Sequence, residues 1–378
     1  MVRALKITII TCLSQHGIKR QHVSDAAKSA KIQRDKKKIA HYRNLTDACL
    51  DLRDSHTYTQ DAYDKTSKLL EENPEFNAIW NYRRDILESW QSNNKDIVTH
   101  LLEELNLSMG LLKRFPKCYW IWSHRVWVLF KLESLNKPQW STELMIVAKM
   151  LEYDLRNYHG WSYRRFIVDN IEKAETSATT TANEDEQILA LVKINSKEFE
   201  YTTSKINNIS NFSAWHNRSQ LIPKIYKLFQ LLKDKSLFPQ LQPIFLSPYS
   251  LLQHELDLVK TGMYVDADDS SVWLYLSWLL TDKFFVESFE STQNYKDVLL
   301  QQLNIVEELN ELEKDDHPKG WDNRWCLKAM ILIRTLLDDS PENDDLTKNW
   351  LKRLIDIDPL RKNKYMDQLN GKLVIVSI

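Results

Sequence analysis

The sequence predicts an all-α protein built from repeated helical hairpins. Five segments each place a tryptophan near the start of an expected helix, at Trp80, Trp122, Trp161, Trp215 and Trp273. An arginine follows three residues later in four of them, at Arg83, Arg125, Arg164 and Arg218, whereas the fifth has Leu276. Residues three apart share one face of a helix. The intervals of 42, 39, 54 and 58 residues between the tryptophans are typical of a repeating supersecondary unit.

Composition argues against several other classes. Only six glycines occur in 378 residues, whereas glycine usually makes up ~7 % of a chain. Neither a GxGxxG nor a GxxxxGK[ST] motif is present, so a phosphate-cradling loop and a doubly wound nucleotide fold are not expected. The net charge of −1 gives no reason to expect binding to nucleic acid or to a membrane surface.

The cysteines and the apolar segments predict a cytoplasmic protein. Four cysteines lie far apart without a CxxC pair, which indicates neither a disulfide framework nor a cysteine zinc site. No apolar run approaches the ~20 residues that span a bilayer. The start, MVRALKITIITCLSQ, has a short apolar stretch broken by Lys6 and no clean cleavage site for a signal peptidase.

The pattern along the chain suggests three regions. We expect an unmatched N-terminal extension at 1–15, a basic arm or solvated helix at 16–57, and one helical-repeat domain at 58–378. The five repeats fall at about 58–92, 95–134, 140–172, 185–229 and 248–281, and further helices follow. The Thr- and Ala-rich stretch 173–187 is predicted to be a loop, and the proline-containing stretch 233–250 a long connection. The apolar tail LVIVSI (373–378) could cap the array or hang free.

The repeat residues are predicted to be structural. A buried tryptophan removes ~150–250 Å² from solvent and can lock one hairpin onto the next. The arginines are expected to pair with acidic side chains or helix C-terminal carbonyls of the adjacent repeat. Asx side chains four residues before three of the tryptophans are expected to cap the second helices, at Asn157, Asn211 and Asp269.

Two turns between helices carry chemistry that the repeat does not require. Lys117 and Tyr119 occupy the turn before Trp122, and Asn157, Tyr158 and His159 occupy the equivalent turn before Trp161. Stacked hairpins align such turns along one edge, where a lysine, phenols and an imidazole would suit an anionic ligand such as a diphosphate. A solvated lysine and a simple N-cap asparagine are the structural alternative. No nucleophile elbow and no HExxH spacing is present.

The five segments resemble the repeat of protein prenyltransferase α subunits, in which a Pro or Asn turn is followed by Tyr, Trp and Arg. The resemblance covers residues ~16 to ~368. NYHGWSYRRFIV (157–168), HGIKR (16–20) and DPLRKNKY (358–365) are most similar to α subunits of Rab geranylgeranyltransferases. The α subunit shared by farnesyltransferase and type I geranylgeranyltransferase tends to read WxHR where this chain has Trp161-Ser162-Tyr163-Arg164.

The resemblance implies a right-handed solenoid, a crescent of hairpins around a separate β subunit. That β subunit would hold the catalytic zinc, so no metal site is expected in this chain. The heterodimer would transfer geranylgeranyl from geranylgeranyl diphosphate to C-terminal cysteines of Rab GTPases presented by a Rab escort protein. Neither nucleic acid nor integral insertion into a membrane is implied.

The resemblance also assigns roles by position. Lys117 matches the lysine that α subunits extend toward the diphosphate, and Tyr119 matches the aromatic residue beside it. Asn157, Tyr158 and His159 match the family's NYH turn at the diphosphate end of the interface. His16 matches a histidine near the α-subunit start that can reach the β subunit's zinc, a role that requires His16 to lie near the true terminus.

Two alternatives stay open at this point. One is the α subunit shared by farnesyltransferase and type I geranylgeranyltransferase. The other is a non-enzymatic scaffold of the tetratricopeptide type, which the 39–58 residue spacing and the Trp-centred motif disfavour.

Overall fold

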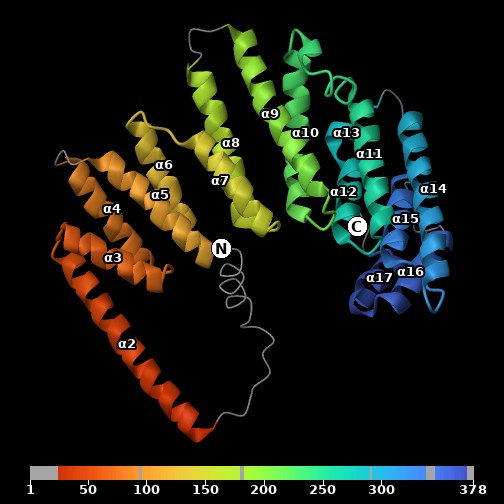
Figure 1. Ribbon diagram of the computed structural model, residues 1–378. Helices are drawn as coiled ribbons and strands as arrows, with labels where there is room; N and C mark the ends of the chain where they lie inside the picture. The colour runs from red at the N-terminus through yellow and green to blue at the C-terminus, as the bar shows by residue number, and fades with distance from the viewer. Residues whose placement is uncertain (1–23, 93–95, 179–182, 290–291, 338–344, 373–378) are drawn as a thin grey trace. The chain divides into compact units, whose positions relative to one another are not determined.

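The computed structural model describes residues 24–92, 96–178, 183–289, 292–337 and 345–372, and these are helical with no strand (Figure 1). None of the helices in these ranges is long and apolar enough to cross a membrane. The chain forms two compact units, which are described separately below. The all-α class and the hairpin repeat are confirmed, while the right-handed crescent stays a prediction.

The first unit comprises Met1–Tyr153 and Asn157–Ile167 and contains hairpins preceded by one long helix. Its helices are α2 (Asp25–Asp54), α3 (Gln60–Glu72), α4 (Asn77–Ser92), α5 (Ile97–Arg114), α6 (Tyr119–Ser134), α7 (Trp140–Tyr153) and the first ten residues of α8 (Tyr158–Ala178). Helices α5 and α6 lie side by side, and α4 packs against both (Figure 1). The helix pairs α3/α4 and α5/α6 therefore coincide with the first two predicted repeats.

The second unit comprises Asp154–Arg156 and Val168–Ile378. Its helices after α8 are α9 (Glu184–Ile206), α10 (Phe212–Leu231), η1 (Lys235–Leu237), α11 (Pro248–Val265), α12 (Ser270–Thr281), α13 (Lys283–Val286), α14 (Thr292–Asp316), α15 (Arg324–Leu337), α16 (Asp345–Ile357), η3 (Pro359–Arg361) and α17 (Lys362–Leu369). The pairs α9/α10 and α11/α12 coincide with the fourth and fifth predicted repeats, and α10 packs against α12.

The loop predicted over 173–187 is wrong for most of its length. Helix α8 continues to Ala178 and α9 begins at Glu184, and residues 179–182 lie outside the described ranges. The Thr-rich composition hid the good helix formers Ala, Glu and Lys on both sides. Asn183 caps α9, since its side-chain oxygen accepts from the N–H of Asp185 at 3.4 Å. The connection 233–250 is ordered, because Phe238, Leu241 and Phe245 in it are buried.

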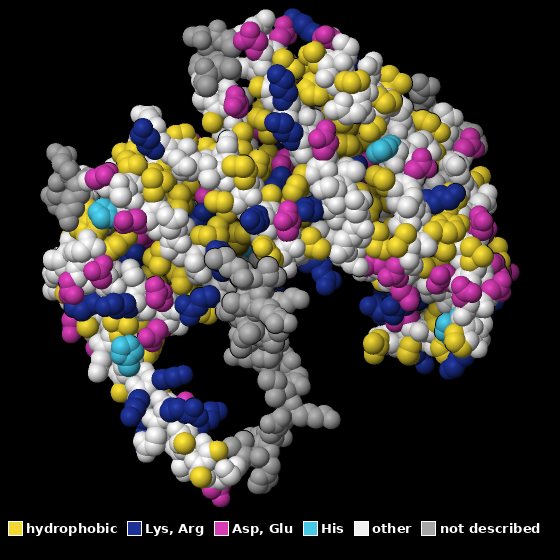
Figure 2. All heavy atoms as spheres, in the orientation of Figure 1, with side chains coloured by type: hydrophobic (Ala, Val, Ile, Leu, Met, Phe, Trp, Pro, Cys, Tyr) yellow, Lys and Arg dark blue, Asp and Glu magenta, His cyan; other side chains and the backbone are white. Residues whose placement is uncertain are grey.

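The basic arm forms the helix α2, whose first half projects from the hairpins of its unit (Figure 1). Every side chain from residue 24 to residue 41 is exposed. Figure 2 shows lysine and arginine side chains spread along this half of the helix. The solvated-helix interpretation of this region is therefore confirmed for residues 25–41, whereas the second half of α2 includes the buried Cys49 and the helix packs against α3 and α4.

The five motif tryptophans are buried, each with at most 6 % of its surface exposed. In four of them the indole N–H donates to the backbone carbonyl six residues earlier, at 2.8–3.0 Å: Trp80 to Pro74, Trp122 to Pro116, Trp215 to Ile209 and Trp273 to Ala267. Each indole thereby fixes the turn before its own helix. The predicted Asx caps are also present, with N–H to side-chain oxygen distances of 2.8–3.3 Å at Asn157, Asn211 and Asp269.

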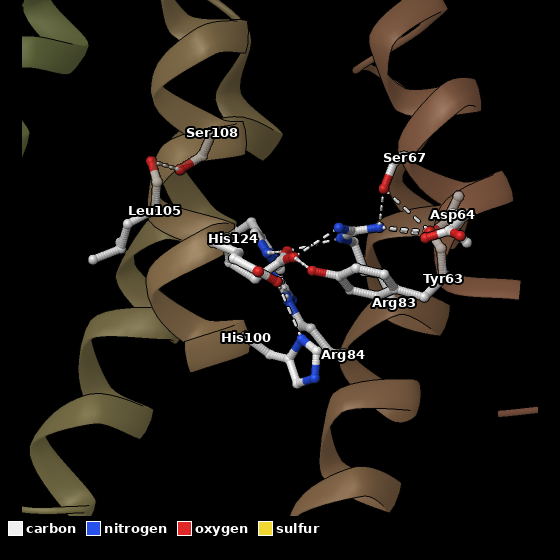
Figure 3. Close-up of polar contacts among 12 residues, drawn as sticks. Tyr63, Asp64, Ser67, Arg83, Arg84, His100, Leu105, Ser108 and His124 are labelled. Atoms are coloured by element: carbon white, nitrogen blue, oxygen red, sulfur yellow. Dashed lines mark hydrogen bonds and ion pairs between the residues drawn. The ribbon is translucent and has the colours of Figure 1, made fainter. Parts of the chain in front are cut away.

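Three buried glutamates each join two successive hairpins, and we call this arrangement a carboxylate joint. In the first joint, Arg83 on α4 donates to both oxygens of Glu104 on α5, at 2.7 Å each. Arg83 also donates to the backbone carbonyl of Tyr63 and to the hydroxyl of Thr66, at 2.9 and 2.7 Å. The Nε2 of His124 on α6 lies 2.7 Å from Glu104. Figure 3 shows Tyr63, Arg83 and His124 converging from α3, α4 and α6.

The charge states of the first joint follow from its contacts. Burial raises the pKa of the Glu104 carboxyl, but the charge of Arg83 and hydrogen bonds from His124 and Arg83 outweigh burial and hold this pKa well below its usual range. Burial lowers the pKa of His124, Glu104 raises it, and the charges of Arg84 and Arg83 lower it further, so the net shift is downward. A neutral imidazole fits the geometry, because Nε2–H donates to Glu104 while Nδ1 accepts from Nε of Arg84 at 3.3 Å.

The same contacts recur in the other two joints, at 2.6–2.7 Å: Arg125 and Tyr163 bind Glu143, and Arg218 and Tyr275 bind Glu255. His124, Tyr163 and Tyr275 all stand two residues after a motif tryptophan, and we call this position the +2 side chain. Each +2 ring also packs on the tryptophan of the preceding repeat, with centroids 4.6–5.0 Å apart: His124 on Trp80, Tyr163 on Trp122 and Tyr275 on Trp215. The predicted pairing of Arg83, Arg125 and Arg218 with acidic side chains of the next repeat is thus confirmed.

The fourth arginine and the leucine of the fifth repeat are also buried. Arg164 is 4 % exposed and Trp161 is 1 % exposed. Leu276, which replaces the arginine in the fifth repeat, is fully buried in α12, and α12 packs against α15. The fifth repeat therefore has apolar packing at this position.

Trp80→Ala should lower the free energy of unfolding by about 3–5 kcal/mol, because a buried tryptophan is removed. Trp80→Phe should cost about 1–3 kcal/mol, because the Pro74 carbonyl loses a buried donor. Urea denaturation of the chain measures both changes. Trp321→Ala is the control, since Trp321 is 43 % exposed, and equal losses at Trp80 and Trp321 would contradict the role of the indole.

Glu104→Gln should destabilise the chain by about 3–5 kcal/mol, because it leaves the Arg83 guanidinium buried without its carboxylate. Glu103→Gln is the matched control on the same helix, where the side chain is 57 % exposed, and it should change stability by less than about 0.5 kcal/mol. Denaturation curves of the two variants, compared with the wild type, check the difference. A Glu104→Gln variant as stable as the control would mean that the joint does not hold the hairpins together.

Stability should fall as the pH falls below about 6.5, the ordinary pKa of histidine, in the range above the titration of the carboxylates. The folded state lowers the pKa of His124, so in this range the unfolded chain binds more protons than the folded chain and acid favours unfolding. His124→Gln keeps a donor toward Glu104 without titrating and should flatten this dependence between pH 7 and 5. A slope insensitive to His124→Gln would disprove the assignment.

Candidate functional site at the hairpin turns

The turns that precede α4, α6 and α8 in the first unit are fastened to one another through proline carbonyls. The carbonyl of Pro74 accepts from the indole of Trp80 and also lies 3.4 Å from the Sγ of Cys118 in the next turn. The carbonyl of Pro116 accepts from its own Trp122 and from the Nδ2 of Asn157, at 3.2 Å. The predicted alignment of these turns along one edge is confirmed within this unit.

Lys117 and Tyr119 lie on this edge with their side chains in solvent. Lys117 is exposed, and Tyr119 is 62 % exposed at the first position of α6. Lys117 forms no ion pair with a carboxylate within the described ranges. Its ammonium is thus available to an anionic ligand, in contrast to the arginines of the carboxylate joints.

His159, at the start of α8, lies between Tyr119 of α6 and Tyr158 of α8. Its ring centroid is 5.9 Å from that of Tyr119 in an edge-on arrangement and 4.0 Å from that of Tyr158. His159 is only 9 % exposed, whereas Tyr158 is 67 % exposed. The structure therefore brings together Lys117, Tyr119, Tyr158 and His159, and Asn157 holds the turn that carries two of them.

Charges from two neighbouring turns act on His159. Burial lowers the pKa of its imidazole, the carboxylate of Glu75 raises it, and the ammonium of Lys117 lowers it. Glu75 was missed from the sequence, although a signal existed: it stands five residues before Trp80, as Lys117 stands five residues before Trp122. The edge thus holds one carboxylate as well as its cation.

The chemistry of these groups suits binding of an anion and not covalent catalysis. Lys117 offers an ammonium, the two tyrosines offer hydroxyl donors, and the neutral imidazole of His159 offers one N–H. Burial raises the pKa of the neighbouring Cys118 thiol to about 11, which keeps it protonated and unreactive at neutral pH. No group of three His, Cys, Asp or Glu side chains that could hold a metal ion occurs among the residues that the structure describes.

Other predictions fall on residues that the structure does not describe. These are His16 with its proposed zinc contact, the extension 1–15, and the tail 373–378. The late segment 358–365 is described. The carboxylate of Asp358 accepts from the hydroxyl of Tyr365 at 2.6 Å and from Arg361 at 3.1 Å, and it lies 3.4 Å from the Nζ of Lys328. These contacts give the segment a structural role at the end of the array.

Comparison with known proteins identifies the repeat. The sequence model of the protein prenyltransferase alpha subunit repeat matches residues 59–90, 101–132, 140–171 and 252–282. These segments coincide with four of the five predicted repeats. The fourth predicted repeat lies outside them, yet α9/α10 carries the same indole and arginine contacts through Trp215 and Arg218.

Three relatives from different organisms share one protein name. Geranylgeranyl transferase type-2 subunit alpha of Candida albicans is 48 % identical over 96 % of this chain and 99 % of the relative. Its namesake in Saccharomyces cerevisiae is 38 % identical over 94 % and 98 %. The Homo sapiens protein of that name is 31 % identical over 70 % of this chain and 41 % of its own length.

A solved structure supports the fold. A chain of the Candida albicans protein geranylgeranyltransferase-I complexed with GGPP matches with a TM-score of 0.60 and 22 % identity, over 88 % of this chain and 91 % of that one. At this identity the likeness concerns the fold alone. The sequence relatives decide the family over the tetratricopeptide alternative. The chain belongs to the protein prenyltransferase α-subunit family, among the α subunits of type-2 geranylgeranyl transferases.

Proposed function

We propose that the chain is the α subunit of a heterodimeric protein geranylgeranyl transferase of type 2. The enzyme transfers geranylgeranyl from geranylgeranyl diphosphate to C-terminal cysteines of Rab GTPases, which an escort protein presents. The names of relatives that match nearly the whole chain support the reaction. The escort protein and the Rab substrate follow from the resemblance of the third repeat to Rab-specific α subunits.

The β subunit completes the enzyme in this proposal. By the resemblance to the prenyltransferase family, this β subunit binds the catalytic zinc. The heterodimer works in the cytoplasm. Buried free thiols at Cys49, Cys118 and Cys326 are consistent with a reducing compartment.

The observation that carries the role of this chain is the cation-bearing edge of the first unit. In the transfer, a bond forms between the cysteine sulfur and C1 of the lipid, and the C1–O bond breaks with its electron pair leaving on the diphosphate. Negative charge therefore grows on the diphosphate in the transition state. The unpaired ammonium of Lys117 is suited to stabilise that charge.

The neighbouring side chains position the leaving group. Tyr119 and Tyr158 present exposed hydroxyls on either side of His159, which can donate one N–H while neutral. Asn157 holds its turn against the Pro116 carbonyl. None of these groups forms a covalent intermediate, so their contribution is electrostatic and geometric.

Co-expression with the β subunit of the same organism tests the proposal. We expect one heterodimer in size-exclusion chromatography that geranylgeranylates a Rab protein in the presence of its escort protein. Transfer of farnesyl or geranylgeranyl to CaaX peptides instead would favour the α subunit shared by farnesyltransferase and type I geranylgeranyltransferase. A chain that stays monomeric beside the β subunit would refute the proposal.

Lys117→Ala should lower the single-turnover rate of prenyl transfer by ~10²–10³-fold, the usual effect of removing one donor aimed at developing charge. Affinity for geranylgeranyl diphosphate should fall much less, because the interaction strengthens as the C1–O bond breaks. Rapid-quench kinetics on the heterodimer separate the two effects. Lys113→Ala is the matched control, at an exposed lysine on the last turn of α5. An unchanged rate constant for Lys117→Ala would return Lys117 to the solvated-surface interpretation.

A further inference from the structure

Glu75 occupies a turn whose backbone is held on both sides. The side-chain oxygen of Asn73 accepts from the N–H of Glu75 at 3.2 Å, and the Nδ2 of Asn73 donates to the hydroxyl of Tyr42 on α2 at 2.7 Å. The carbonyl of Pro74 is bound by the indole of Trp80 at 2.8 Å. The carboxylate of Glu75 is exposed but is carried by a fixed backbone.

The same turn touches the segment that carries Lys117 and Tyr119. Cys118 stands between these two residues, and its Sγ lies 3.4 Å from the carbonyl of Pro74. Burial raises the pKa of the Cys118 thiol, and the charge of Glu75, the residue that follows Pro74, raises it further. Glu75 is therefore a direct neighbour of the turn from which the Lys117 ammonium extends.

Glu75 and Lys117 stand on turns that contact each other through Pro74 and Cys118, and their charges shift the pKa of His159 in opposite directions. No ion pair joins Glu75 to Lys117 in the described ranges, so the carboxylate does not neutralise the ammonium by contact. It instead lowers the positive potential of the whole edge. No carboxylate is needed to bind a diphosphate, and the repeat does not require an acid at this position, because Lys117 fills it in the next repeat.

We propose that Glu75 is a positioning residue that offsets part of the positive potential around Lys117 and so promotes release of the diphosphate product. The inference rests on the proposed function and extends it to product release. The breaking bond leaves all of the negative charge on pyrophosphate. An edge with an unopposed cation would hold that product more tightly than the substrate and slow turnover. One fixed carboxylate on the neighbouring turn weakens binding of a multiply charged anion without blocking its approach.

The test compares binding of inorganic pyrophosphate to heterodimers that carry Glu75→Gln, Glu75→Asp or Glu71→Gln. Glu75→Gln should bind pyrophosphate roughly 3- to 10-fold more tightly than wild type, as expected for loss of one partly screened charge near the ligand. Glu75→Asp keeps the charge and should bind like wild type. Glu71 is an exposed carboxylate near the end of α3, and Glu71→Gln should also bind like wild type.

Kinetics supply a second readout that a purely structural role would not produce. In Glu75→Gln, inhibition by pyrophosphate should strengthen by the same factor, while the single-turnover rate should rise by no more than about 2-fold, because the diphosphate gains only part of its charge between the bound substrate and the transition state. In the Lys117→Ala background, the effect of Glu75→Gln on pyrophosphate binding should shrink, because the two charges act on one ligand.

Unchanged or weaker pyrophosphate binding in Glu75→Gln would overturn the inference, and so would equal tightening in Glu71→Gln. A Glu75→Gln variant that fails to assemble, together with a Glu75→Asp variant that binds pyrophosphate several-fold differently from wild type, would also overturn it. Failure of the proposed function has a different signature, since the wild-type heterodimer would then neither transfer the lipid nor bind pyrophosphate.

Discussion

The carboxylate joint is the interaction on which the hairpin array of each unit depends. One buried glutamate receives a two-pronged hydrogen bond from the arginine of the preceding hairpin and a single bond from the +2 side chain of its own hairpin. A buried ion pair adds little net stability compared with apolar packing, but breaking it costs several kcal/mol, roughly 3–5. Any slip between two hairpins would leave both charges buried and unpaired. The joint therefore fixes the register of neighbouring hairpins more than it raises their stability.

Because the register of neighbouring hairpins is fixed, the side chains on their turns keep constant positions relative to one another and can together form a binding site. The turns before α4 and α6 are each pinned by the indole that follows, and the carbonyl that binds this indole also contacts the next turn. Two cationic side chains of the first unit consequently lie in opposite environments. Arg83 is buried and bound by a carboxylate within the joint, whereas Lys117 is exposed and has no carboxylate partner among the residues that the structure describes. The structural polar groups satisfy one another inside the array, and those on the edge remain available to a ligand.

Much of this could be predicted from the sequence, because the motif repeats. The tryptophans, the Asx caps and an acidic partner for the arginines followed from spacing and residue type. The identity of that partner did not, because the separation from arginine to glutamate varies: Arg83 to Glu104, Arg125 to Glu143 and Arg218 to Glu255 span 21, 18 and 37 residues. A constant signal was present instead, since each glutamate stands 20 residues before its +2 side chain. Glu75 was missed for another reason: its influence on His159 depends on contact between two turns, which only the folded chain shows.

The fifth repeat shows why the joint can end. Its arginine is replaced by Leu276, and α12 packs against α15, in which every residue from Cys326 to Ile333 is buried. A helix surrounded by apolar contacts does not have to present a carboxylate to a preceding arginine, so an apolar side chain satisfies the position. A polar cluster lies further along the chain, where the carboxylate of Asp358 accepts from Arg361 and Tyr365 and lies near the Nζ of Lys328 on α15. In three repeats an ion pair between the motif arginine and a buried glutamate fixes the register of the next hairpin. In the fifth repeat, which meets a helix packed by apolar contacts, leucine occupies the arginine position.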